Sequence, residues 1–493
     1  MTEEIETMIK KLIDKYNSLP VQIKASFWFL TCSFMQKGIS TITVPIFTRL
    51  LTTAEFGQIS VYNSWQGIIS IIVSLHLTAG VYMRGLVAYE EKRKEFISSM
   101  QGLCFTLILI WFGVYLIFKD FWNGLFNLTT PLMLIMFANI WLSSVFAFWA
   151  SEQKVDYKYE RLVALTLLMA VLNPVLSIYL VLSCEDKVTA RIVGGVIVEL
   201  ILFGWLFIYH LNRGKKFFSK EYWKYAICFN LPLLPHYLSA IVLNSSDRIM
   251  IANMIDNKSA GIYSLSYSIS MVLSLFSNSL LSTVEPWLYK KIKANDFKLV
   301  PKISYASFSL MAGINIILIA FAPEILSFFA PKEYYEAVWI IPPVTMSVYF
   351  IFAYTFFAVF EFYFKKTGYI ATATMVGAVL NIILNYIFIK QYGYFAAGYT
   401  TLICYIIYAV AHYIFMRKVC KDFLDGARVY SLKILLLITA IFMTIGFAFL
   451  ATYIDISARY SLIGVLLVIT LICHKVIIGS VKNLINIKRN KDG

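Results

Sequence analysis

The sequence predicts an all-α, polytopic membrane protein with 14 transmembrane helices. Of its 493 residues, 59% are hydrophobic and 14% are charged, and the mean hydropathy is +0.72. Apolar spans of about 20 residues, the length that crosses about 30 Å of hydrocarbon, recur from end to end. The connections between spans are short and alternate in charge, so we expect the activity to reside between helices rather than in a separate domain.

The first expected element is an N-terminal amphipathic helix over residues 1–22, because Ile5, Ile9 and Ile13 recur at helical spacing. We expect it to lie on the inner surface of the membrane. No cleavable signal sequence is expected, because a full-length span follows the first charged stretch. The fourteen spans are expected near residues 23–47, 57–83, 97–118, 131–150, 161–183, 190–210, 226–254, 260–289, 303–329, 337–363, 367–389, 395–416, 430–453 and 458–480.

Two short stretches recur at similar spacing along the chain. Gly57–Ser60 resembles Gly261–Ser264, and Ala170–Asn173 recurs as Ala378–Asn381. Each pair falls at matching helix positions, which indicates duplication of a six-helix unit. Such parallel copies are related by an axis along the membrane normal and hold the substrate path between them. We therefore predict two pseudo-symmetric six-helix lobes plus two C-terminal helices: an N-lobe at 23–210, a C-lobe at 211–416, and helices 13 and 14 with a basic cytoplasmic tail at 417–493.

The net charge of +15 reports topology rather than a nucleic-acid partner. Most of the 43 basic residues lie in alternate connections and in both terminal segments. By the positive-inside rule, both termini are expected in the cytoplasm. Seven cysteines without a CxxC and five histidines without an HxxxH or HExxH spacing predict neither a disulfide framework nor a metal site.

Charged side chains inside the spans are the candidate functional residues. The stretch Leu231–Tyr267 is long enough to cross a bilayer, yet it contains Asp247 and Arg248. Charges at that depth cost a few kcal/mol, so we expect them to face a wet cavity or a partner. Pro232 and Pro235 in the same stretch remove backbone hydrogen bonds, which is tolerated only inside a helix bundle.

Three groups of residues stand out along the chain. They are Pro45–Thr52 with Glu55–Gly57, Asp247–Ile251 with Gly261–Ser264, and Leu380–Asn385 with Tyr392–Gly393 and Ala396–Gly398. Together they resemble bacterial polysaccharide-repeat flippases of the Wzx type, in the multidrug/oligosaccharidyl-lipid/polysaccharide exporter superfamily. The resemblance covers residues 20–420. It implies a two-lobed, fourteen-helix transporter of the bacterial inner membrane that moves an undecaprenyl-diphosphate-linked oligosaccharide to the outer leaflet.

A diphosphate cannot cross hydrocarbon without compensating cations, so the substrate-binding candidates are basic. Lys37 lies about thirteen residues inside the first span, about 20 Å at helical rise, which is too deep for its side chain to reach the inner surface. Arg248 can bind phosphate oxygens bidentately, although it could instead fix packing through a local pair. Arg49 and Arg84 lie at span ends, where anchoring is the alternative role.

Two acidic residues are candidates for ion coupling. Asp247 could exchange H⁺ or bind Na⁺, or it could neutralise a nearby base. Glu285 lies near the inner end of its span, where an interfacial role is the alternative. Asn381 and Asn385 are expected to bond between helices rather than to touch a glycan. We expect no cofactor.

The alternative functions would require a different loop structure or a different charge in the lumen. A polymerase or glycosyltransferase would need a large external loop, so we expect no enzyme. A multidrug or cation antiporter would favour an acidic or apolar lumen, whereas Lys37 and Arg248 favour an anion. A lipid II flippase of the same superfamily stays open. The expected partners are the lipid-linked oligosaccharide, and the polysaccharide polymerase and chain-length proteins that would use it.

Overall fold

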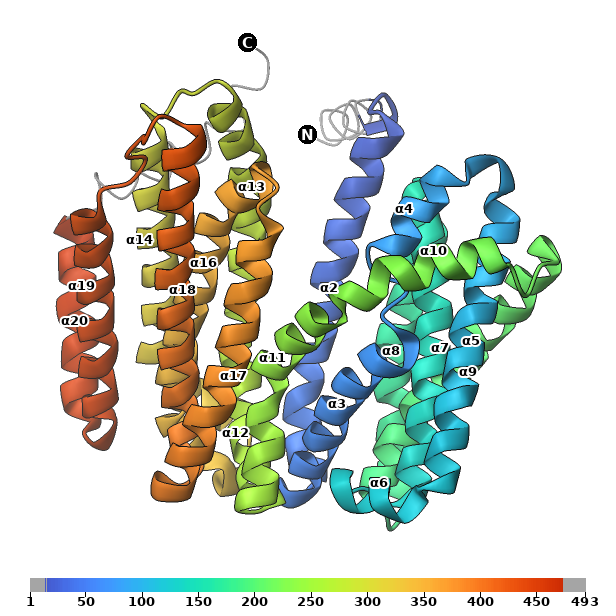
Figure 1. Ribbon diagram of the computed structural model, residues 1–493. Coiled ribbons are helices and arrows are strands. Elements are labelled where there is room, and N and C mark those ends of the chain that lie inside the picture. The colour runs from blue at the N-terminus through green and yellow to red at the C-terminus, as the bar shows by residue number, and fades with distance from the viewer. Residues whose placement is uncertain (1–13, 15, 473–493) are drawn as a thin grey trace, which may run out of the picture. The chain divides into compact units, whose positions relative to one another are not determined.

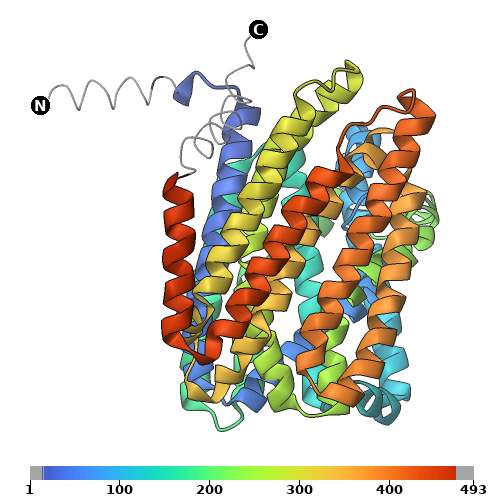
Figure 2. The same cartoon turned by 90° about the vertical axis from the view of Figure 1, so that its left-hand side faces the viewer.

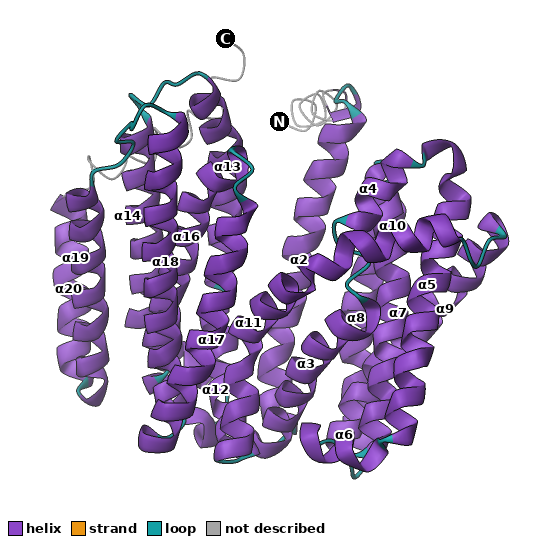
Figure 3. Ribbon diagram, viewed as in Figure 1, coloured by secondary structure: helices purple, strands orange, loops and turns teal. Residues whose placement is uncertain are grey.

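The computed structural model describes residue 14 and residues 16–472. Within this part of the chain every regular element is a helix, and no strand occurs (Figure 3). This confirms the predicted all-α class. The chain forms two compact units, which are described separately here. Unit 1 comprises Met1–Leu50 and Trp65–Leu238, and unit 2 comprises Leu51–Ser64 and Ser239–Gly493.

Unit 1 is built around α9, against which α5, α7 and α8 pack. Large apolar side chains fill the contacts: Phe203 and Leu206 of α9 are buried together with Val145 and Trp149 of α7. Its elements are α2 (Val21–Leu50), the second part of α3 (Thr53–Ser74), α4 (Val81–Ala88), η1 (Glu90–Lys92), α5 (Arg93–Ile117), α6 (Lys119–Phe126), α7 (Thr130–Val155), α8 (Tyr159–Ser183), α9 (Lys187–Gly214), α10 (Lys220–Asn230) and η2 (Leu231–Leu233) (Figure 1).

Unit 2 is built around α16, most of whose side chains are buried against α12, α13, α14 and α18. Figure 2 shows the yellow, orange and red helices of this unit running alongside one another. Its elements after the first part of α3 are α11 (Leu234–Met254), α12 (Asn257–Met271), α13 (Leu273–Lys293), α14 (Val300–Ala320), α15 (Ala322–Phe329), η3 (Lys332–Trp339), α16 (Ile341–Tyr363), α17 (Thr367–Tyr392), α18 (Phe395–Phe423), α19 (Leu432–Ala451), η4 (Thr452–Ile454) and α20 (Ile456–Ile472).

Eleven helical stretches in the described residues are long and apolar enough to cross a membrane, which confirms a multi-pass membrane protein. The other three predicted spans also fall on helices. Residues 23–47 lie within α2, which has 30 residues, and 57–83 covers most of α3 and the beginning of α4. The last span, near 458–480, corresponds in part to α20, which has 17 residues. Its end, the predicted tail and most of the predicted helix at 1–22 lie outside the described residues.

The span predicted at 57–83 is not continuous, and this corrects the sequence reading. Helix α3 ends at Ser74, and α4 begins only at Val81. Leu75 and His76 between them have φ of 49° and 48°, in the left-handed region that ends an α-helix. Apolar periodicity continues through the turn, so the sequence pattern gave no sign of the break.

A second break separates α10 from α11, at the 3-10 turn that contains Pro232. The two breaks meet inside unit 1. The side-chain amide of Asn230 is fully buried and donates 2.9 Å hydrogen bonds to the carbonyls of both Leu75 and His76. The His76 carbonyl also accepts from the backbone amide of Ala79 at 3.0 Å, whereas the Leu75 carbonyl has only the Asn230 bond among those described.

The repeated glycines Gly57 and Gly261 face each other across α3 and α12 in unit 2. A Cβ on Gly57 would lie 1.8 Å from the carbonyl oxygen of Asn257, and a Cβ on Gly261 would lie 2.1 Å from that of Thr53. Only glycine allows the backbones of two helices to approach this closely. The sequence repeat therefore marks a contact between the two copies of the motif.

Candidate functional site

Asp247 is the centre of a polar cluster inside unit 2. Its side chain on α11 is fully buried. One carboxylate oxygen accepts hydrogen bonds from the Tyr263 hydroxyl at 2.5 Å and from the Thr401 hydroxyl at 3.0 Å. The other accepts from the side-chain amide of Asn385 at 2.5 Å. Asp247 is therefore held by donors from three helices, α12, α17 and α18.

The cluster extends from Asp247 through the asparagines of α17. Asn381 accepts hydrogen bonds from the Ser246 hydroxyl at 2.8 Å and from the Asn385 amide at 3.2 Å. The Thr400 hydroxyl donates to the side-chain oxygen of Asn385. These bonds link α11, α17 and α18, as expected of Asn381 and Asn385. In a lipid environment such bonds join helices, because an unpaired polar group there is costly.

The donors to Asp247 are all neutral. In the described residues its carboxylate has hydrogen bonds to a phenol, a hydroxyl and an amide, and no ion pair. Hydrogen bonds stabilise an ionised carboxylate but do not cancel its charge. The side-chain oxygens of Asn381, Asn385 and Thr401 lie in the same hydrogen-bonded set. A site of this kind, buried in the membrane and rich in oxygen, suits a proton or a small hard cation.

Arg248 does not pair with Asp247, although the two are adjacent in sequence. Its guanidinium donates to the backbone carbonyl of Asn244 at 2.8 Å and lies 4.2 Å from the centre of the Tyr267 ring. The Asn244 side chain accepts in turn from the hydroxyl of Tyr405 at 2.9 Å. Arg248 is partly exposed.

The remaining predicted site residues are dispersed over the two units. Lys37 is exposed on α2 in unit 1, and Arg84 is exposed on α4, with its guanidinium 5.7 Å from the Phe229 ring. Arg49 is exposed at the end of α2 and donates to the Pro45 carbonyl at 2.8 Å. Glu285 on α13 accepts a 2.8 Å hydrogen bond from the Tyr289 hydroxyl. Asp247 and Arg248 are neighbours on α11, and Lys37 and Arg49 both lie on α2. The roles of all six remain predictions.

Sequence reasoning missed the partners of Asp247. Tyr263 and Thr401 lie far from it in the chain, and neither stands out in its own helix. The signal that could have located the cluster is the pair Asn381 and Asn385, four residues apart and hence on one face of an otherwise apolar helix. No group of three His, Cys, Asp or Glu side chains that could hold a metal ion occurs in the described residues.

The chain matches the family model described as "Polysaccharide biosynthesis protein" over residues 23–291. That range is more than half of the chain and contains all six predicted site residues. A Lsg locus protein of Haemophilus influenzae is 24% identical over 377 residues, which cover 73% of this chain and 89% of the relative. A second relative from the same organism, an uncharacterized membrane protein, is 22% identical over 372 residues, 73% of this chain and 88% of that protein.

Solved structures of MATE transporters share the fold. An inward-facing multidrug resistance MATE family transporter of the MOP superfamily has a TM-score of 0.59 at 12% identity, covering 78% of this chain and 95% of that chain. A mutant of the Vibrio cholerae MATE transporter VcmN has a TM-score of 0.54 at 13% identity, covering 83% and 97%. Together with the family match, they confirm the resemblance seen in the sequence: this chain belongs to the polysaccharide biosynthesis protein family, with the fold of MATE transporters of the MOP superfamily.

Proposed function

We propose that the protein is a flippase that moves an undecaprenyl-diphosphate-linked oligosaccharide across the bacterial cytoplasmic membrane for surface polysaccharide synthesis. The observation that carries the proposal is the family match, which spans the helices that hold Lys37 and Arg248. Alternating access between two lobes, with both termini in the cytoplasm, is part of the proposal. The polysaccharide polymerase and the chain-length proteins are its proposed downstream partners.

The charges within the spans support an anionic substrate. A diphosphate carries negative charge that hydrocarbon cannot solvate, so it needs cations along its path. Lys37 is exposed on α2, where its ammonium group is available to a ligand. Arg248 is partly exposed, and its guanidinium lies against the Tyr267 ring. Arg49 and Arg84 add cations near helix ends, and we propose that they take part in binding the same headgroup.

The coupling ion is proposed to act at Asp247. Its carboxylate has neutral donors only and lies beside the oxygens of Asn381 and Thr401, a set that accepts H⁺ or Na⁺. Binding a cation would cancel the buried negative charge and allow the surrounding helices to rearrange. Glu285, which accepts from Tyr289, is proposed as a second acidic group that modulates this step.

The test is complementation of a bacterial strain that lacks its own flippase, followed by mass spectrometry of the lipid-linked intermediate that accumulates. Wild type should restore surface polysaccharide. Lys37→Ala should reduce export at least tenfold at unchanged protein level, because the diphosphate loses a cation. Lys390→Ala is the matched control, since Lys390 is also exposed but lies in the last turn of α17. Full export by Lys37→Ala would remove this residue from the mechanism.

The same experiment separates the alternatives. A lipid II flippase would rescue cells in which lipid II accumulates and would leave surface polysaccharide unchanged. A multidrug or cation antiporter would raise resistance to cationic dyes and would restore neither lipid intermediate. Either result would overturn the proposed substrate while leaving the family assignment intact.

A further inference from the structure

Each unit contains a buried glutamate beside a buried histidine, on the fourth and sixth spans of its predicted half. In unit 1, Glu152 of α7 lies 3.3 Å from the Nε2 atom of His210 on α9. In unit 2, Glu361 of α16 lies 2.8 Å from the Nδ1 atom of His412 on α18. All four side chains are at least 98% buried. None of them belongs to the Asp247 cluster.

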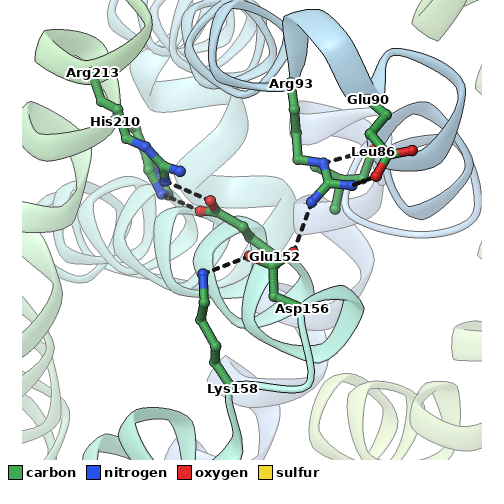
Figure 4. Close-up of polar contacts among 8 residues, drawn as sticks. All are labelled: Leu86, Glu90, Arg93, Glu152, Asp156, Lys158, His210 and Arg213. Carbon is green, nitrogen blue, oxygen red and sulfur yellow. Dashed lines mark hydrogen bonds and ion pairs between the residues drawn. The ribbon is translucent and has the colours of Figure 1, made fainter.

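In unit 1, Arg213 joins Glu152 and His210 and balances the negative charge of Glu152 (Figure 4). The Nη1 atom of Arg213 lies 2.5 Å from the Glu152 carboxylate, so the two charges cancel. The Gln101 amide lies 2.9 Å from the Nδ1 atom of His210 and, as a donor, requires an unprotonated nitrogen there. The group is therefore electrically balanced when His210 is neutral. A further proton would leave a net positive charge buried between helices.

The pair in unit 2 has no such arginine. Arg213 comes three residues after His210, and the residue three after His412 is Phe415, whose ring lies 6.2 Å from the imidazole. Glu361 has His412 as its only ion-pair partner in the described part of the chain. The second carboxylate oxygen of Glu361 and the Nε2 atom of His412 are both buried, and within the described residues neither has a hydrogen-bond partner.

The net charge of the Glu361–His412 pair depends on whether it binds a proton. With a neutral imidazole whose Nδ1–H donates to the carboxylate, the pair carries a net charge of minus one. An uncompensated buried charge is strongly unfavourable, and its environment tends to remove it by protonation. Two unpartnered acceptors are available, the Nε2 lone pair of His412 and the second carboxylate oxygen of Glu361, and imidazole is ordinarily the stronger base of the two. One proton at Nε2 converts the imidazole to an imidazolium and brings the pair to neutrality, a state that unit 1 reaches without a proton.

We propose that Glu361 and His412 form a proton-binding site of unit 2, separate from the Asp247 cluster, and that Glu152, His210 and Arg213 are its non-titrating counterpart in unit 1. The proton binds at Nε2 of His412 and leaves from the same atom, so no other group changes covalently. As a step in transport the site rests on the proposed function, which it deepens by naming the coupled ion as H⁺.

The imidazole of His412 lies among aromatic rings. Two tyrosine rings, Tyr354 of α16 and Tyr408 of α18, lie 5.5 Å and 4.6 Å from the imidazole. The buried Tyr430 hydroxyl has no hydrogen-bond partner in the described residues. Several other titratable or charged side chains of the helices packed here do have partners. These are Glu285 with Tyr289, Tyr305 with the Ser431 amide, Arg417 with the Ala427 carbonyl, Lys418 with the Tyr369 ring, and the Tyr408 hydroxyl with Thr374. On α19, Lys433 is exposed.

The proposal is tested by nitrogen-15 NMR of histidine-labelled, full-length protein in detergent micelles. The chain has five histidines, and loss of a signal in His412→Gln and in His210→Gln assigns the two of interest. As the pH is lowered over the range in which the protein stays folded, the His412 signal should change from neutral imidazole to imidazolium, because the proposed proton binds at its Nε2 atom. The His210 signal should stay neutral. A His412 that keeps one state over the whole range overturns the proposal.

Exchanging the residue three after each histidine tests the charge argument. Phe415→Arg should hold His412 neutral throughout, whereas Phe415→Leu, the size-matched control, should leave its titration unchanged. Arg213→Leu should make His210 titrate. Glu361→Gln changes shape least and removes the negative charge, so His412 should then stay neutral. If His412 titrates in Glu361→Gln as it does in wild type, the pair is not the proton site.

The NMR result and the transport result are independent. If His412 titrates while the wild type fails to restore surface polysaccharide, the proton site stands and the proposed function is wrong. If the wild type restores polysaccharide while His412 never changes state, the proposed function stands and this inference is wrong. If both succeed, export by His412→Gln should lose its dependence on medium pH, and retention of the wild-type pH profile would exclude coupling at this site.

Discussion

Replacing Asn230 by leucine should destabilise unit 1, because its side chain bonds two carbonyls of the turn between α3 and α4. Its amide donates to Leu75 and His76 at 2.9 Å, and the side chain is fully buried. Leucine has nearly the same size but no donor. The His76 carbonyl would keep the 3.0 Å hydrogen bond that it accepts from the Ala79 amide, whereas the Leu75 carbonyl would lose its described partner.

The magnitude follows from the number of bonds lost. A buried group left without a partner costs about 1–3 kcal/mol in soluble proteins. Hydrogen bonds between membrane helices average about 0.6 kcal/mol, with a maximum of about 1.7 kcal/mol, because the unfolded chain in the membrane finds other partners. Two lost bonds should therefore cost about 1–4 kcal/mol, which is a large part of the stability of an ordinary domain.

The assay is unfolding of the purified protein in mixed micelles of a mild and a denaturing detergent, followed by tryptophan fluorescence. Asn253→Leu is the matched control, because Asn253 is exposed on α11 and the same substitution there removes no described bond. Asn230→Leu should unfold at a clearly lower fraction of denaturing detergent than Asn253→Leu. Equal midpoints for the two variants would show that the Asn230 bonds do not hold the breaks together.

Two further predictions concern a helix contact and a helix cap. Gly57→Ala should lower the free energy of unfolding by about 1–3 kcal/mol, because its Cβ would lie 1.8 Å from the Asn257 carbonyl oxygen. The control Gly113→Ala, whose Cβ would have no atom within 4 Å, should be neutral or stabilising in the same assay. Equal effects of the two substitutions would contradict the close approach at Gly57. Asp186 caps α9 by accepting from the Thr189 amide at 3.0 Å, and hydrogen bonds from Thr189 lower the pKa of this carboxyl. Its contribution to stability should be present above the unfolded pKa, about 3.9, and should be lost as the pH falls through the lower folded value. In Asp186→Asn the melting temperature should therefore fall less than in wild type as the pH is lowered. An unchanged dependence of melting temperature on acid pH would show that Asp186 contributes nothing to this fall.

The candidate site was only partly visible in the sequence. Asp247 and Arg248 stood out because ionised groups are rare inside apolar spans, and that rule needs no structure. In the described residues Arg248 does not pair with Asp247, and its guanidinium instead contacts a carbonyl of its own helix and the Tyr267 ring of α12. Which donors reach Asp247 depends on how α11, α12, α17 and α18 pack. Residues far apart in the chain meet there for reasons that no local pattern contains.

The sequence by itself determined the helical class, the membrane location and the order of the spans. Hydrocarbon forces every backbone group to bond within its own segment, so length and hydropathy alone define a span. The repeated glycines were also visible in the sequence, and the structure places them at one close contact between α3 and α12. Only the tertiary structure decided where helices break, which polar groups pair and which glutamate has an arginine. Those outcomes depend on side-chain contacts between distant segments, and hydropathy carries no information about them.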